Sequence, residues 1–391
     1  DEDVAVSLDE LEELAETAGA VTVAKVIQNR EAVHPGTYIG KGKIEEVAAL
    51  IQAYDANGVI CDDELSPAQL NNLERELDCK VMDRTLLILD IFAARAVSGE
   101  GKIQVELAQL KYRASRLAGL GKSLSRLGGG IGTRGPGEKK LEMDRRLIRE
   151  RISRLKKELK DVERHRELIR GQRKQSGLKV AALVGYTSAG KSSIENALTQ
   201  AGVLEDAMLF STLDTTTRAL TLDNTQEILL TDTVGFINKL PHHLVEAFKS
   251  TLEEAKYADI IVHVVDASNP QMDAQMHVVY ETLRQLGAEG KPVVTLFNKQ
   301  DKVENPVNHK DLQADYSIAT SAKTGQGMEA FKQALLEIIR KEQIYIERLY
   351  DFSEAGKIQL IRSKGQLLSE EYVPEGIEVK AYVPQDIYGR L

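Results

Sequence analysis

The chain has 391 residues, 42% of them hydrophobic and 28% charged, with a net charge of −9. This composition is typical of a globular protein with two or three domains. The longest apolar run, around residues 260–265, has only the length of a strand, so we expect no membrane-spanning helix and no stable membrane insertion. Cys61 and Cys79 lack metal-binding spacing, and no export signal is visible. We therefore expect two free thiols and a cytoplasmic protein, with peripheral membrane association as an alternative.

The charge is unevenly distributed along the chain. Residues 101–180 contain 23 Lys and Arg against 9 Asp and Glu, a net charge of +14, so the remainder carries −23. A basic block in an acidic protein is typical of an element that binds a polyanion. A solvated helical face rich in Lys and Arg explains the charge equally well, and the two interpretations stay open at this point.

Residues 1–98 are expected to form a small α/β domain, because short apolar runs alternate with helical patterns. Strands are predicted at 20–28 (AVTVAKVIQ) and 58–63 (GVICDD). Helices are predicted at 43–56 and 66–78, the second with Ser66 as its N-cap.

Residues 99–173 are expected to form a long antiparallel helical hairpin. A first helix is predicted at 101–121, followed by a basic Gly-rich loop, GGGIGTRGPGEKK, at 128–140. Apolar residues then recur at steps of three and four, as in a coiled coil; they include Leu141, Ile148, Ile152, Leu155, Leu159, Val162 and Ile169. The loop would lie at the tip of this hairpin.

Residues 178–342 are expected to form a domain of the α/β class, and residues 343–391 a small α+β module. Continuous apolar runs of strand length separated by helical stretches indicate a buried parallel sheet. These runs are KVAALVG, EILLTDTVG, DIIVHVVDAS and KPVVTLFNK. In the C-terminal module, strands are predicted at 344–352, 357–365 and 377–384.

The stretch GYTSAGKS, residues 185–192, matches the Walker A pattern between a strand and a helix. Its glycines allow the backbone to wrap around phosphates. Lys191 would reach the β- and γ-phosphates, and the Ser192 hydroxyl would bind Mg²⁺. A structural turn is the alternative for each isolated motif, but the context favours a phosphate site.

Further motifs follow in the order of a guanine-specific GTPase. In DTVG (232–235), Asp232 would hold the Mg²⁺ shell and the Gly235 amide would reach the γ-phosphate. In NKQD (298–301), Asp301 can accept two hydrogen bonds from guanine, and adenine would leave this carboxylate unpaired. SAK (321–323) would add a backbone amide for the guanine oxygen.

The stretch FSTLDTTTR, residues 210–218, is the candidate for a mobile threonine loop that completes the Mg²⁺ site. Thr212 is the first candidate and Thr216 the second. Phe236 stands where Ras-like enzymes have the glutamine that orients water. We therefore expect slow intrinsic hydrolysis that a partner stimulates.

Together the motifs predict a site for GTP or GDP with Mg²⁺. The residues predicted to act in catalysis are Lys191, Thr212 and Gly235, and the predicted metal ligands are Ser192, Thr212 and Asp232. The residues predicted to bind nucleotide are Gly185, Tyr186, Thr187, Ser188, Ala189, Gly190, Lys191, Ser192, Ser193, Phe210, Thr212, Asp232, Gly235, Asn298, Lys299, Asp301, Ser321, Ala322 and Lys323.

Over nearly its whole length the chain resembles the HflX family, within the Obg-like, translation-factor-associated GTPases. The resemblance rests on TYIGKGKIEEV (37–47), DDELSPAQLNNLE (62–74), GGGIGTRGPGEKKLEMDRR (128–146) and DTVGFINKLPHHLVEAFKSTLEEA (232–255), as well as on the GTPase motifs. It implies a GTPase, a monomer when free, that binds the large (50S) ribosomal subunit and splits stalled 70S ribosomes under stress, particularly heat. The 50S subunit, with its 23S rRNA and proteins, would stimulate hydrolysis. The predicted rRNA contacts on the hairpin are Arg126, Arg134, Lys139 and Lys140.

Two other functions stay open: a GTP-controlled regulatory binding module, and an ATP-driven enzyme that remodels rRNA and has weak ATPase activity. The basic hairpin favours the second of these, and the resemblance implies it too, because ATP binding or hydrolysis is attributed to some members of the family. The chain also departs from the family pattern at Ser188, Ser193, Ile194, Glu195 and Thr215. Glu195 replaces a large apolar side chain. If it is buried, it needs a polar partner to avoid destabilising its helix.

Overall fold

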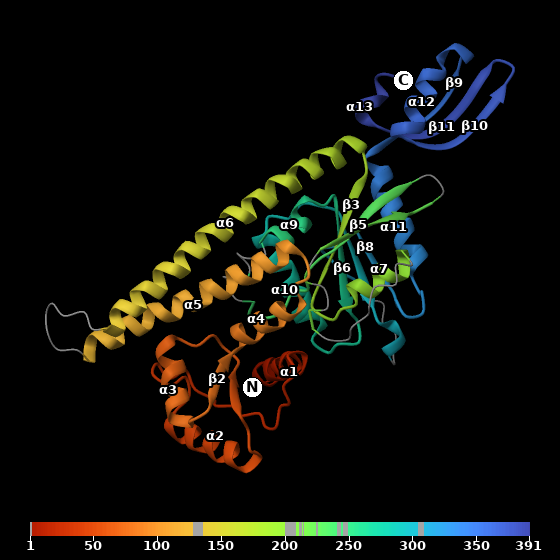
Figure 1. The fold of residues 1–391 in the computed structure, drawn as a ribbon. Helices are drawn as coiled ribbons and strands as arrows, with labels where there is room; N and C mark the ends of the chain where they lie inside the picture. The colour runs from red at the N-terminus through yellow and green to blue at the C-terminus, as the bar shows by residue number, and fades with distance from the viewer. Residues whose placement is uncertain are drawn as a thin grey trace. The chain divides into compact units, whose positions relative to one another are not determined.

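The computed structural model describes residues 2–127, 136–199, 209–210, 213, 215–223, 226–240, 244, 249–303 and 309–391 (Figure 1). They fall into two compact units. The N-terminal unit comprises Asp1–Arg164, Ala207–Asp214 and Ile237–Ser250, and the GTPase unit comprises His165–Asp206, Thr215–Phe236 and Thr251–Leu391. Within the described ranges, none of the helices has both the length and the apolar character that crossing a bilayer requires.

The N-terminal unit contains a two-stranded parallel sheet, in which β1 (Gly58–Cys61) pairs with β2 (Lys80–Asp83). The predicted Ser66 cap is confirmed, since Ser66 and Gln69 form a capping box at the start of α3. The helices around the sheet are α1 (Glu2–Thr17), α2 (Lys41–Tyr54), α3 (Pro67–Leu77) and α4 (Arg84–Arg95).

The strand predicted at 20–28 is wrong. This stretch has no regular secondary structure, and Val21 is 85% exposed. A strand requires a hydrogen-bonded neighbour as well as an apolar pattern. No strand pairs with it among the residues that the structure describes.

A buried carboxylate joins the first helix of the hairpin to the small sheet. Asp83 is 0% exposed and accepts hydrogen bonds from the amides of Leu65 and Leu86, at 3.0 and 2.9 Å. Tyr112 on α5 donates its hydroxyl at 2.9 Å, and Arg116 binds Asp83 at 2.5 Å while stacking on the Tyr112 ring. Because these four groups all bind the same buried carboxylate, replacing Asp83 should strongly destabilise the unit.

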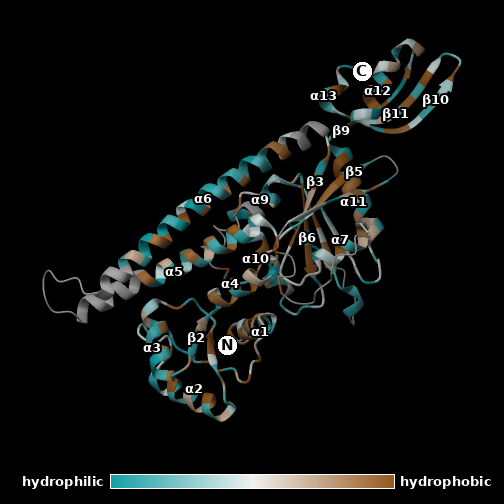
Figure 2. Ribbon diagram, viewed as in Figure 1, coloured by the Kyte–Doolittle hydropathy of each residue, from teal (hydrophilic) through white to brown (hydrophobic). Residues whose placement is uncertain are grey.

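The predicted hairpin consists of α5 (Gly99–Leu127) and α6 (Pro136–Ser176). Arg151 binds Glu106 through two hydrogen bonds of 2.7 and 2.8 Å, and Arg145 donates to the carbonyl of Leu117. Leu117 lies further along α5 than Glu106, but its partner Arg145 lies nearer the start of α6 than Arg151, so the two helices are antiparallel. Leu107, Leu155 and Leu159 form their shared core. Most of α6 is hydrophilic in Figure 2, and the tip residues 128–135 lie outside the described residues.

The GTPase unit is built on the predicted, predominantly parallel sheet, in the order β4-β5-β3-β6-β7-β8. Edge strand β4 is antiparallel to β5, and the other neighbours are parallel. The strands are β3 (Lys179–Gly185), β4 (Thr216–Thr221), β5 (Glu227–Asp232), β6 (Ile260–Asp266), β7 (Val293–Asn298) and β8 (Tyr316–Ala319). The helices are α7 (Lys191–Thr199), α9 (Lys249–Tyr257), α10 (Met272–Gln285) and α11 (Met328–Lys341), with a 3₁₀ turn, η1, at Gln300–Lys302.

The C-terminal module is an antiparallel sheet in the order β10-β11-β9. The strand predicted at 357–365 is wrong, because this stretch forms helix α12. Ile358 and Ile361, three residues apart, are both buried and belong to the same core as the sheet residues, which suits a helical face. The elements are β9 (Gln343–Tyr350), η2 (Phe352–Glu354), α12 (Ala355–Lys364), β10 (Gln366–Val373), β11 (Gly376–Pro384) and α13 (Gln385–Tyr388).

Candidate nucleotide-binding site

The Walker A residues form a loop between the carboxyl end of β3 and the first turn of α7. Strand β3 ends at Gly185 and α7 begins at Lys191. Gly190 has φ +95°, and a Cβ there would lie 2.4 Å from Asn298 Nδ2, so only glycine fits. Tyr186, Thr187 and Ala189 are buried in the loop, and Ser193 is half-buried on α7. A loop of this form directs amides and a helix N-terminus toward a bound anion.

Lys191 has the environment expected of a phosphate-binding lysine. It is 6% exposed, and its Nζ lies 3.1 Å from the carbonyl of Tyr186. Burial lowers the pKa of Lys191 to about 8, helped by the charge of Lys299 and opposed by that of Asp232. The Ser188 hydroxyl is also buried and has no hydrogen-bond partner among the described residues. Phosphate oxygens would supply the charge and acceptors that this loop lacks, so the residues fit a nucleotide.

The two predicted metal ligands that are described lie side by side. Ser192 Oγ donates to Asp232 Oδ2 at 2.8 Å, although the residues are 40 apart in sequence. Oxygen donors of this kind suit Mg²⁺, which retains several waters when it binds. Nowhere in the described ranges do three or more His, Cys, Asp or Glu side chains gather into a metal site.

Asn298 links the two sides of the candidate site. Its Nδ2 donates to the carbonyl of Ala189 at 3.0 Å, and its Oδ1 accepts from the amide of Ala322 at 3.1 Å. The side chain therefore holds the Walker A loop and the SAK loop together. This bridging role has no local signal in the sequence.

The remaining base-recognition residues are held by their neighbours. Ser321 Oγ donates to Asp301 Oδ1 at 2.7 Å, and this hydrogen bond lowers the pKa of Asp301. Asp301 is therefore ionised at neutral pH and can accept hydrogen bonds from a base. Lys299 pairs with Asp266 at 2.7 Å, a contact that the motif did not reveal, and Lys323 is exposed.

The DTVG segment lies directly against the Walker A loop. The Thr187 amide donates to the carbonyl of Phe236 at 2.7 Å, and the Phe236 amide donates to the carbonyl of Gly185 at 3.0 Å. A Cβ on Gly235 would lie 2.9 Å from Thr187 Cα and 3.1 Å from Lys191 Nζ. The Phe236 side chain is 1% exposed, so it is packed in the core instead of facing solvent.

The unusual Glu195 is buried, at 1% exposed, and it has partners. It accepts the hydroxyl of Thr216 at 3.1 Å and lies 3.6 Å from Arg218 Nε. Burial raises the pKa of Glu195 to about 7, and Asp232 adds to the shift, whereas Thr216 and Arg218 oppose it. The hydroxyl of Thr216, the second candidate for the Mg²⁺ threonine, therefore donates its hydrogen bond to Glu195.

Several predicted residues do not join this arrangement. Phe210 belongs to the N-terminal unit, where its ring packs edge-on against Phe92 with centroids 4.7 Å apart. Thr212 and Arg134 lie outside the described residues. Arg126, Lys139 and Lys140 lie on α5 and α6, but their side chains are not among those described.

In comparisons with known proteins, three sequence-family profiles match successive stretches of this chain. Sequence-family profiles described as GTP-binding GTPase N-terminal, GTP-binding GTPase middle region and 50S ribosome-binding GTPase match residues 5–93, 95–173 and 180–299. GTPase HflX of Lacrimispora saccharolytica is 64% identical over 100% of this chain and 92% of its own length. GTPase HflX of Escherichia coli is 40% identical over 97% of this chain and 87% of its own length.

A GTP-binding protein from Sulfolobus solfataricus, crystallised in complex with GDP, is 26% identical over 85% of this chain and 95% of its own. The TM-score is 0.44. The profiles and the full-length relatives decide the assignment. This chain, a GTP hydrolase with a P-loop GTPase fold, belongs to the HflX family.

Proposed function

We propose that the protein binds the 50S ribosomal subunit and splits or rescues stalled 70S ribosomes under stress, with hydrolysis of GTP stimulated by the ribosome. The observation that carries this is the pairing of a guanine-specific motif set with a long basic hairpin in one chain of the HflX family. We further propose that it acts in the cytoplasm as a monomer, with domains at 1–98, 99–173, 178–342 and 343–391.

In this proposal Lys191 neutralises the β- and γ-phosphates, and Ser192, Asp232 and Thr212 surround Mg²⁺. Asp301 reads the guanine edge, while Asn298 keeps the base-binding loop against the phosphate-binding loop. The pairs Ser192–Asp232 and Asn298–Ala189 support these roles. Magnesium would stabilise the charge that develops on the transferred phosphoryl group.

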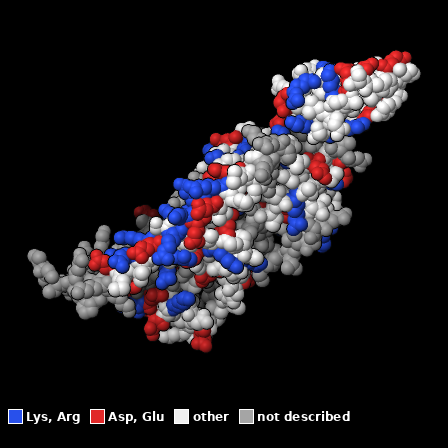
Figure 3. Space-filling view, turned by 45° about the horizontal axis from the view of Figure 1, so that its top comes forward, with Lys and Arg blue, Asp and Glu red and all other residues white. Residues whose placement is uncertain are grey.

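The hairpin would bind ribosomal RNA. Lys and Arg side chains are interleaved with acidic ones along the surface in Figure 3. Among the α6 residues whose side chains are described, the exposed basic ones are Arg146, Arg149, Arg154, Lys156, Lys157, Lys160 and Arg164. Cations spread along one helix suit a phosphate backbone, which dominates the affinity of such complexes. Arg126, Arg134, Lys139 and Lys140 would extend this surface to the tip.

The decisive experiment measures GTP hydrolysis with and without purified 50S subunits, and the 70S peak in sucrose gradients. We expect stimulated hydrolysis and a GTP-dependent loss of 70S particles. An unchanged 70S peak at saturating GTP, beside a competent splitting factor as control, would refute the splitting activity. Recovery of a different partner without 50S proteins would favour a regulatory binding module instead.

A further inference from the structure

Three polar side chains form a row across the sheet of the GTPase unit. His263 on β6 is paired with Thr295 on β7, and Thr295 is paired with Ser317 on β8. Residues that lie directly opposite one another in a sheet point to the same face. His263 and Thr295 are 1% and 0% exposed, so this face is buried along the row. Buried polar groups need polar partners, and the row therefore needs one above it.

That partner is Asp311, from the connection between β7 and β8. Its Oδ2 accepts the hydroxyl of Thr295 at 2.6 Å, and its backbone amide donates to Ser317 Oγ at 2.9 Å. The hydroxyl of Tyr280, on α10, also donates to Oδ2. His263 Nδ1 lies 4.0 Å from the same oxygen, which is too far for a hydrogen bond. A single residue thus joins β7, β8 and α10.

Asp311 is a buried carboxylate that no cation balances. It is 5% exposed, and within the residues that the structure describes no Lys or Arg side chain forms an ion pair with it. Burial lowers the pKa of His263 to about 4, against the opposing effect of Asp311, so the imidazole is neutral at pH 7. Hydrogen bonds from the two hydroxyls and from the amide of Gln313, at 2.9 Å, therefore hold the carboxylate. Because these donors come from different elements, they also fix its position.

Further contacts attach the same connection along β7. Of the described residues 309–315, His309 packs against the Phe297 ring, with centroids 5.3 Å apart. At the other end, the Asp315 amide donates to the carbonyl of Val293 at 2.8 Å, and Asp315 Oδ2 accepts the Val293 amide at 2.9 Å. The connection therefore runs back along β7 from its carboxyl end to its start, with the buried carboxylate between the two ends.

Strand β8 is the short edge strand that leads into the base-recognition loop. It has four residues, and in the described part of the sheet its one neighbour is β7. Directly after it, the carbonyl of Thr320 accepts the amide of Gln300, in the NKQD motif, at 3.1 Å. The next two residues, Ser321 and Ala322, bind other residues of that motif at 2.7 and 3.1 Å. The Walker A loop follows β3, which is separated from β8 by β6 and β7.

We propose that Asp311 is a positioning residue for the guanine base, because it fastens β8 in the place that sets the SAK loop against the NKQD motif. Ser317, which the Asp311 amide binds, lies four residues before Ser321. A four-residue strand with one neighbour is weakly held by its own ladder, so its position depends on this anchor. Loss of the anchor displaces the contacts to the base and leaves those to the phosphates in place.

The test measures intrinsic GTP hydrolysis of the full chain without ribosomes, at a temperature at which wild type and variants are folded. In Asp311→Asn one accepting oxygen replaces two, so the donors on both sides of the carboxylate cannot all be kept. We expect the KM for GTP to rise by about threefold to tenfold, the range for the loss of about one hydrogen bond, with kcat unchanged. When chemistry is slow, this KM reports the affinity for GTP.

Hydrogen exchange of backbone amides supplies a second measurement. Asp311→Asn should speed exchange in residues 320–323 and leave residues 185–192, the Walker A loop, as they are in the wild type. Tyr280→Phe and Thr295→Val each remove one hydroxyl donor and keep the carboxylate. Each should change the KM and the exchange in the same direction as Asp311→Asn, by a smaller amount.

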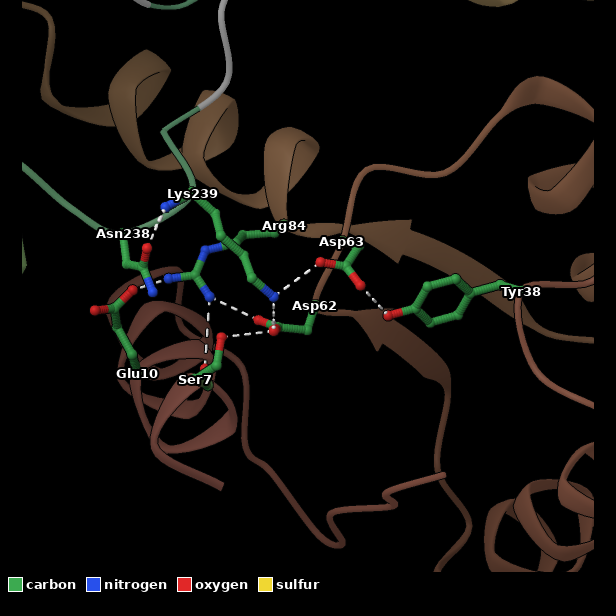
Figure 4. A network of polar contacts seen from close by, with 8 residues as sticks. All are labelled: Ser7, Glu10, Tyr38, Asp62, Asp63, Arg84, Asn238 and Lys239. Carbon is green, nitrogen blue, oxygen red and sulfur yellow. Dashed lines mark hydrogen bonds and ion pairs between the residues drawn. The ribbon is translucent and has the colours of Figure 1, made fainter. Parts of the chain in front are cut away.

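The matched control is Tyr38→Phe. Tyr38 is likewise a half-buried tyrosine whose hydroxyl donates to an aspartate, Asp63 at 2.7 Å, but both residues belong to the N-terminal unit (Figure 4). Its replacement should leave the KM for GTP and the exchange of residues 320–323 unchanged.

An unchanged KM in Asp311→Asn, with unchanged exchange in residues 320–323, would overturn the proposal. So would faster exchange in residues 185–192 to the same extent, or a lower kcat, because these would show that Asp311 only stabilises the whole unit. If Asp311→Asn does not fold, Tyr280→Phe and Thr295→Val decide by the same criteria. No ribosome is present, so none of these results bears on the proposed ribosomal function.

Discussion

Replacing the buried Glu195 with Gln should stabilise the GTPase unit at alkaline pH. Gln keeps the shape and an acceptor for Thr216 but carries no charge. Burial raises the pKa of Glu195 from 4.5 to about 7, so between these values the folded protein binds more protons than the unfolded chain. Glu195 therefore does not lower the free energy of unfolding below pH 4.5, where it is protonated in both states. Its destabilising effect grows as the pH rises from 4.5 to 7 and is fully present above 7.

The size of the effect follows from the same shift. A pKa displaced from 4.5 to about 7 corresponds to about 3 kcal/mol at pH 8 and below about 1 kcal/mol at pH 5. About 3 kcal/mol raises the melting temperature of a unit of this size by roughly 6 °C or more. Calorimetry of nucleotide-free Glu195→Gln and wild-type protein from pH 5 to pH 8 measures this difference directly.

The control is Glu329→Gln, the same substitution at an exposed glutamate of the GTPase unit whose side chain is 81% exposed. Its melting temperature should follow that of the wild type at every pH. A difference between Glu195→Gln and wild type that does not change with pH would contradict the reasoning. A variant less stable than wild type at pH 8 would show that the Arg218 pair outweighs the cost of burying the charge.

Three further outcomes are expected. Asp301→Asn should lower GTP affinity by more than about tenfold, because the amide cannot accept both hydrogen bonds that guanine donates to the carboxylate; if xanthosine triphosphate bound no better than GTP to this variant, Asp301 would not read the base edge. Replacing Arg134 and Lys139 with Ala should weaken 50S binding and flatten its salt dependence while intrinsic hydrolysis stays constant, and unchanged 50S affinity would count against the loop as an RNA contact. Asp83→Ala should destabilise the N-terminal unit by about 3–5 kcal/mol, because Arg116 would be left without its buried partner; denaturant unfolding would show this, and a loss under about 1 kcal/mol would contradict it.

Much of the candidate site was predictable from contiguous motifs. In GYTSAGKS the residues that shape a phosphate loop are neighbours in the chain, so their pattern reveals their chemistry. The continuous apolar runs before DTVG and NKQD predicted buried parallel strands, and these place the polar residues at one edge of the sheet. The Ser66 cap and the hairpin helices were also predictable, because capping and helical periodicity are local properties.

Contacts between distant segments could be found only in the tertiary structure. Whether Glu195 was tolerable depended on Thr216 and Arg218, which stand on a strand more than 20 residues away. Periodicity did not distinguish helix α12 from a strand, nor did it reveal that residues 20–28 lack a strand to pair with.

The membership of the segment after DTVG in the N-terminal unit likewise has no signature in the sequence. The pairing of Lys239 with Asp62 and Asp63 joins residues separated by more than 170 positions. Local sequence determined which residues could bind a nucleotide, because that chemistry lies in short motifs. Folding decided which charges are buried together, because burial and ion pairing depend on neighbours that are remote in the chain.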